Sequence, residues 1–181
     1  MKLRTLIRLW LWVTLMAIAA FVVLAVVDSK LKAATGFGTI DLQSARSGMD
    51  DKRVFAAWIA REHAAMAGFN LGFDFLFMPL YAVSFYFSAM LAREAFAPKR
   101  GALRRLIDYL GFVPFVGAIA DAVENSLEFN MLSSGASDQL ASAAFTATSI
   151  KMVCFYVGLV LLLGGIVGAV RLRWPKKEET A

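Results

Sequence analysis

The chain has 181 residues, of which 59% are hydrophobic and 18% are charged, and its formal net charge is +5. Soluble globular domains hold roughly 45 to 50% apolar and about 25% charged residues, so this composition excludes an ordinary soluble domain and indicates an integral membrane protein. Contact between basic residues and anionic lipid headgroups accounts for the positive charge, and no nucleic-acid partner is predicted.

Four apolar stretches reach the roughly 20 residues that a transmembrane helix needs. They cover about residues 6–27, 67–92, 110–132 and 141–170. We therefore predict an all-α fold, an integral membrane four-helix bundle, with residues 1–181 forming a single transmembrane domain.

The first stretch follows the basic segment "MKLRTLIR". Its apolar run is longer than the roughly 7 to 15 residues in the core of a secretory signal peptide, and no convincing small-x-small cleavage site follows it. This favours a span that is retained in the mature protein, with removal as a signal peptide left open as the alternative.

The long connection at residues 28–66 has two parts. Its first part, "DSKLKAATGFGTIDLQSARSG", is rich in Gly, Ser and Thr and predicts an irregular loop with at most a short strand or turn. The second part runs from Asp50 without a helix breaker, and Phe55 and Trp58 share one helical face. We predict a short interfacial helix here, which leads into the second span or is continuous with it.

The other two connections differ in length and charge. Residues 93–109 contain Pro98 and Gly101 among several basic residues and predict a short cytoplasmic turn. The connection "SSGASDQ" is so short that the third and fourth spans must be antiparallel neighbours.

Basic residues concentrate on the cytoplasmic side of membrane proteins. Here they precede the first span, separate the second from the third and follow the fourth; they are Lys2, Arg4, Arg8, Arg93, Lys99, Arg100, Arg104, Arg105, Arg171, Arg173, Lys176 and Lys177. We therefore expect a multi-pass protein of the bacterial inner membrane with both termini cytoplasmic (N-in/C-in) and with membrane lipids as partners. Because small four-span chains usually need partners to form a complete transport path, we also expect a homo-oligomer or a partner membrane protein.

The third span carries charged groups at bilayer depth. Residues three or four positions apart share one face of a helix. One such stripe contains Asp121, Glu124, Asn125 and Glu128. Facing lipid, each mid-membrane charge would cost about 2.5 to 3.5 kcal/mol. The stripe must therefore face the interior of the bundle or a cavity.

The neighbouring spans carry matching polar groups. In the second span these are His63, Asn70, Asp74 and Tyr81, and in the fourth they are Thr148 and Lys151. If the turn between spans three and four is centred near Ala136, Asp121 lies level with Lys151 and Glu124 with Thr148. The predicted ligand- or ion-binding residues are Asp74, Asp121, Glu124, Asn125, Glu128 and Lys151, with His63, Asn70, Tyr81 and Thr148 as accessory residues.

Four intramembrane carboxylates facing one lysine indicate a site that binds or conducts a proton, a cation or a cationic amphiphile. Two alternatives stay open: a membrane enzyme that modifies a lipid or isoprenoid, and a structural or assembly protein whose polar groups hold the bundle together. No obvious nucleophile is present, so an enzyme is the less favoured class and no catalytic residue is assigned. No cofactor is predicted, although a divalent metal on Asp74, Glu124, Glu128 and His63 is left open.

Four segments carry a resemblance: "TGFGTIDLQSA", "AAW", "GFDFLFMPLYA" and "AIADAVENSLEFNML". In sequence and spacing they resemble a family of bacterial four-span membrane proteins with no known activity. The resemblance implies the same four-span topology for this chain, and it implies no catalytic residues.

Overall fold

The computed structural model of the protein describes residues 2–99 and 101–173. Arg100, Lys176 and Lys177, three of the basic residues that predict the orientation, lie outside the described residues. Within them the chain forms helices and no strand. The helices are α1 (Leu3–Thr35), α2 (Thr39–Gln43), α3 (Gly48–Ala60), α4 (Ala64–Phe96), α5 (Ala102–Leu110), α6 (Val113–Ser134) and α7 (Asp138–Arg173).

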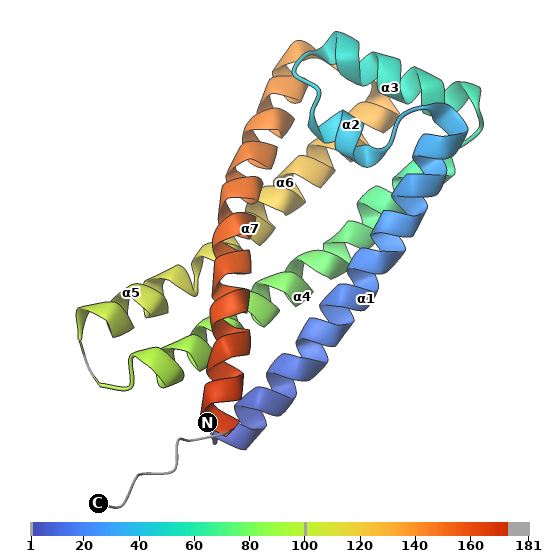
Figure 1. Cartoon of the computed structure of the whole chain (residues 1–181). Coiled ribbons are helices and arrows are strands. Elements are labelled where there is room, and N and C mark those ends of the chain that lie inside the picture. Colours follow the sequence, from blue (N-terminus) through green and yellow to red (C-terminus); the bar gives the residue numbers. More distant parts are fainter. Residues whose placement is uncertain (1, 100, 174–181) are drawn as a thin grey trace, which may run out of the picture.

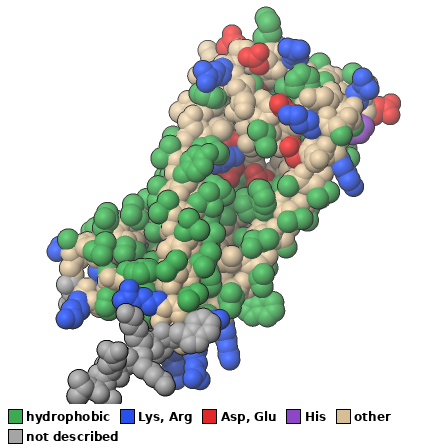
Figure 2. Space-filling view, in the orientation of Figure 1, with side chains coloured by type: hydrophobic (Ala, Val, Ile, Leu, Met, Phe, Trp, Pro, Cys, Tyr) green, Lys and Arg blue, Asp and Glu red, His purple; other side chains and the backbone are tan. Residues whose placement is uncertain are grey.

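Four helical segments of the described chain are long and apolar enough to cross a membrane: Leu3–Thr35, Ala64–Phe96, Ala102–Ser134 and Asp138–Arg173. Hydrophobic side chains cover the sides of the molecule, and charged side chains gather at its two ends (Figure 2). This confirms the all-helical class and is the architecture of a multi-pass membrane protein. The side of the membrane on which the termini lie stays a prediction.

Helix α4 is the centre of the bundle, because it packs against α1, α6 and α7. The beginning of α1 and the end of α7 lie close together, and from there the two helices diverge towards the opposite end of the molecule (Figure 1). The contact at the end near the termini is apolar and is formed by Leu6, Ile7, Trp10, Leu91 and Ala169.

Small residues let α7 approach the backbone of α4. A Cβ atom added at Gly165 would lie 2.6 Å from Ser88 Cα. Ser88 also accepts a hydrogen bond from Trp10 Nε1 (2.8 Å), and Ser84 shares one with Thr14 (2.7 Å). Ser84 and Ser88 of α4 therefore hold α1 through hydrogen bonds, and Gly165 of α7 packs against the backbone of Ser88.

Residues 36–63 fold over the end of the bundle that lies away from the termini, and we call this segment the cap (Figure 1). Asp28 in α1 accepts hydrogen bonds from the backbone N–H and the hydroxyl of Thr39 in α2. Trp58 in α3 is fully buried and donates to the Phe37 carbonyl (2.8 Å). The N–H of Gly48 donates to Asp138 at the start of α7 (2.8 Å).

The cap differs from the predicted irregular loop. Helix α1 continues past residue 27 to Thr35, since no breaker interrupts it before Gly36, whose φ is +86°. The short strand or turn expected next is helix α2. Helix α3 is present as predicted, but it is separated from α4 by Glu62, which has a left-handed φ of 58°. Its position at a membrane interface stays a prediction.

The predicted cytoplasmic turn at residues 93–109 is wrong in extent. Helix α4 runs on to Phe96, and α5 forms from Ala102, so that the turn is confined to the Pro98 and Gly101 region. Arg93 holds the two helices together, since its guanidinium donates to Asp108 in α5 (2.7 Å) and to Glu94 (2.8 Å).

The Gly165 contact predicts a steric effect at one position. We expect Gly165→Ala to destabilise the bundle by about 1 to 3 kcal/mol, as overpacking does, because its methyl group meets the α4 backbone. Gly164→Ala is the matched control, since its Cβ would lie 3.4 Å from Ala92 Cβ, an ordinary contact. Thermal unfolding in detergent measures both, and equal stability of the two variants would contradict the close contact.

Candidate functional site

The polar stripe of α6 faces the interior of the bundle. The opposite face of the helix is apolar and exposed at Val116, Ile119 and Val123. The buried face consists of Pro114, Gly117, Ala120, Asp121, Glu124, Asn125, Glu128 and Met131. This orientation keeps the charged side chains away from lipid, where each charge would be costly.

Lys151 of α7 lies between two carboxylates of α6. Its Nζ is 2.9 Å from Asp121 Oδ1, and it is 3.0 Å from Glu124 Oε1 and 2.9 Å from Glu124 Oε2. All three side chains are buried. Such a cluster satisfies charges that would be very costly to bury singly.

Asp74 of α4 lies on the other side of Asp121. Its Oδ2 accepts a hydrogen bond from Asn125 Nδ2 (2.9 Å), which also donates to the Leu71 carbonyl (3.2 Å). Asp74 and Asp121 border the same cavity. Tyr81 donates its hydroxyl to Asp121 Oδ2 (3.3 Å). The structure thus joins Asp74, Asp121, Glu124, Asn125 and Lys151 in one polar cluster.

A cavity of about 630 Å³ reaches this cluster from between α1 and α7. Asp74, Asp121, Tyr81 and Lys151 lie on its wall. Figure 2 shows acidic and basic side chains in a hollow in the middle of this face of the molecule. Its other walls include the apolar side chains Phe21, Leu24, Phe77, Met152 and Phe155, and α2 and the end of α1 border it with Asp28, Ser29, Lys32, Thr39, Ile40 and Gln43.

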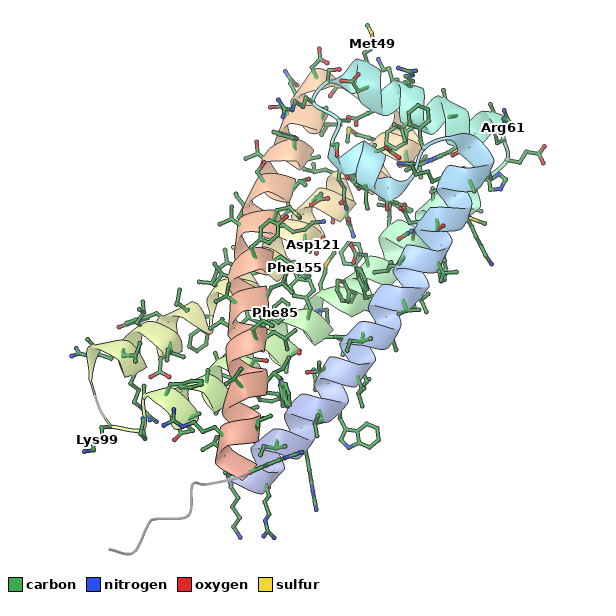
Figure 3. The ribbon with its side chains drawn as sticks, in the orientation of Figure 1. Met49, Arg61, Phe85, Lys99, Asp121 and Phe155 are labelled. Carbon is green, nitrogen blue, oxygen red and sulfur yellow. The ribbon has the colours of Figure 1, made fainter. Side chains whose placement is uncertain are left out.

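An aromatic layer lies beneath the cavity. Tyr81, Phe85 and Phe155 pack with ring centroids 5.4 to 5.8 Å apart. Phe85 and Phe155 lie on the side of Asp121 that faces the termini (Figure 3). The cavity is therefore bordered by packed rings towards the termini, whereas it opens between α1 and α7.

The accessory residues have different positions. Asn70 lines the cavity and donates to the Leu24 carbonyl (3.4 Å). Thr148 is buried on α7, one helical turn before Lys151, and donates its hydroxyl to the Ala144 carbonyl (3.0 Å). It does not line the cavity.

His63 is not brought to the cluster. It is the N-cap residue of α4, and its Nδ1 contacts the Arg61 carbonyl. It precedes Asp74 by eleven helix positions, which is about 16 Å along the axis. Among the described residues no group of three or more His, Cys, Asp and Glu side chains is placed to hold a metal ion. The divalent metal left open by the sequence stays untested.

Glu128 lies apart from the cavity, fully buried under the cap. Among the described residues, no group donates to its Oε2. Its neighbours include Asp51 of α3, which is 2% exposed and also has an oxygen, Oδ2, without a donor in the described chain. Asp51 is not among the predicted site residues, although it shares the helical face of Phe55 and Trp58.

The chain matches no protein-family model, no curated protein and no solved structure. The resemblance to a family of bacterial four-span membrane proteins therefore stays a prediction.

Replacing Lys151 removes the ammonium group of the cluster and leaves its carboxylates without their partner. We expect Lys151→Met to cost about 3 to 5 kcal/mol, because Asp121 and Glu124 lose their buried partner. Neutralising both carboxylates in the triple variant with Asp121→Asn and Glu124→Gln should restore most of this loss. Thermal unfolding at pH 8 measures it.

The control is Lys32→Met, which removes an exposed ion pair with Asp41 and should change stability by less than about 1 kcal/mol. A triple variant as unstable as the single one would show that uncompensated charge is not the cause.

The buried Asp51 predicts a pH effect on the cap. Burial and, to a smaller extent, the charge of Asp50 raise the pKa of Asp51 from 3.8 to about 6. The folded state therefore holds this proton more tightly than the unfolded chain, and stability is lost as the pH rises from 3.8 to about 6.

Asp51→Asn removes this ionisation, so its stability relative to the wild type should increase over the same pH interval, by up to about 3 kcal/mol. Hydrogen exchange of the α3 amides against pH measures it, with the exposed Glu62→Gln as the control. A constant difference between variant and wild type from pH 4 to pH 7 would contradict the assignment.

Proposed function

We propose that the protein binds an amphiphilic molecule with a cationic group, placing the cation at Asp74 and the apolar body in the cavity between α1 and α7. The observation that carries this proposal is the position of Asp74 on the wall of a cavity of about 630 Å³. Asp74 accepts a hydrogen bond from the neutral amide of Asn125, whereas the Lys151 ammonium contacts Asp121 and Glu124.

Charge balance supports a cationic ligand. Asp74, Asp121 and Glu124 meet one ammonium group, and a poorly solvated interior strengthens the attraction between the surplus carboxylate and a cation. Aromatic faces also attract cations, and Phe21, Phe77, Tyr81 and Phe155 line the same cavity.

The walls of the cavity support an amphiphile. Ligand pockets usually have volumes of about 300 to 1,000 Å³ and are mainly apolar with a few converging polar groups. The opening between α1 and α7 is on the side of the bundle, which an amphiphile reaches from the lipid. With both termini in the cytoplasm, as the basic residues predict, this opening would face the outer leaflet of the bacterial inner membrane.

Two observations favour binding over conduction and over a purely structural role. The layer of Tyr81, Phe85 and Phe155 borders the cavity towards the termini, which favours binding over conduction. A polar network that only holds helices together would be filled by its own side chains, whereas Asp74 and Asp121 border open volume.

Binding of rhodamine 6G, a fluorescent cationic amphiphile, tests the proposal. The wild-type protein in detergent should raise its fluorescence polarisation in a saturable manner. We expect Asp74→Asn to weaken binding at least about tenfold, equivalent to about 1.4 kcal/mol, because the cation loses its carboxylate. An anionic dye of similar size, sulforhodamine B, should not bind.

Asp51→Asn is the matched control, since it removes a buried carboxyl group that does not line the cavity. It should keep the wild-type affinity within about threefold. The proposal fails if rhodamine 6G does not bind the wild type, or if both variants bind it as tightly as the wild type.

A further inference from the structure

Asp74 and Asp121 form a pair of carboxyl groups at the wall of the cavity. Both side chains border the same cavity, Asp74 from α4 and Asp121 from α6. Two adjacent carboxylates repel each other when both are ionised. The empty cavity therefore favours one proton on the pair.

The contacts of the pair place that proton on Asp74. Asp121 Oδ1 is 2.9 Å from the Lys151 ammonium, and its Oδ2 accepts from Tyr81. Both contacts stabilise the ionised form of Asp121. Asp74 accepts a hydrogen bond from a neutral amide and is the less stabilised of the two as an anion.

The remaining charged groups around Asp74 give the same result. Its charged neighbours are the carboxyl groups of Asp121, Glu124 and Glu128 on α6 and the ammonium group of Lys151 on α7. On α1, Asp28 and Lys32 border the cavity. Tyr81 on α4 is the other titratable group at the site, and Asp51 of α3 lies beyond, near Glu128. Carboxylates outnumber ammonium groups, so ionised Asp74 needs an added cation.

We infer that the cavity exchanges a proton for its ligand at Asp74, so that each bound cation releases one proton. This rests on the proposed function. In the exchange, the O–H bond of the Asp74 carboxyl group breaks, the proton leaves to water, and the carboxylate pairs with the cationic group of the amphiphile. Proton and cation therefore compete for the same oxygen atoms, and the total charge of the site is unchanged.

Calorimetric titration of the wild-type protein with rhodamine 6G tests the exchange. Titrations in two buffers with different ionisation enthalpies, repeated from about pH 5 to about pH 9, give the number of protons released per ligand. At the acidic end we expect about one proton per ligand, with the affinity rising about tenfold per pH unit until Asp74 is ionised. Above that pH the release should cease and the affinity should become constant.

Two variants locate the proton. Asp51→Asn, which removes a buried carboxyl group outside the cavity, should release the proton as the wild type does. Asp74→Asn should show only its residual binding, without release. Affinity that is independent of pH across the whole range, with no proton released, would overturn the exchange while leaving the proposed function intact. Absence of rhodamine 6G binding at every pH would instead show that the proposed function itself is wrong.

Discussion

The contact of one ammonium group with two carboxylates is the constraint on which the interior of this protein depends. Lys151 reaches both Asp121 and Glu124 only if α6 and α7 are rotated so that these side chains face each other. That rotation also turns Asn125 inward, and Asn125 in turn holds Asp74 of α4. In a medium that solvates charge poorly, any other register would leave a charge unpaired at a cost of several kcal/mol. Electrostatics therefore selects the arrangement of three helices that are otherwise similar in their apolar surfaces.

Packing determines the rest of the arrangement and makes the two ends of the molecule different. Near the termini, Gly165 lets α7 approach α4, and Trp10 of α1 reaches Ser88 across the same contact. Towards the cap, α1 and α7 diverge, and the cavity opens between them. Helices α1 and α7 are thus close together near the termini and separated towards the cap, which is where a ligand finds room.

Hydropathy and helical spacing predict much of this protein from its sequence. The four spans follow from runs of apolar residues, and the pairing of Asp121 with Lys151 follows from the short connection between two antiparallel helices. Helix α2 was not predicted, because Gly, Ser and Thr residues suggest a loop and the contact of Thr39 with Asp28 of α1 is not visible in the local sequence. Nor was the position of Asp51 beside Glu128, since local spacing does not reveal which helix covers which. The position of His63 at the start of α4, away from the cluster, depends on the helix break at Glu62, which the sequence did not predict.

The hydrogen bonds of the cap connect two helices that border the cavity from opposite sides. Asp28 attaches α2 to α1, and the N–H of Gly48 attaches α3 to the first residue of α7. The cap therefore acts as a strap across the mouth of the cavity, and its length limits how far α1 can swing from α7. Any molecule large enough to wedge these helices apart places that strap under tension. Separating α1 from α7 at this end therefore requires the cap to change shape or to release one of these hydrogen bonds.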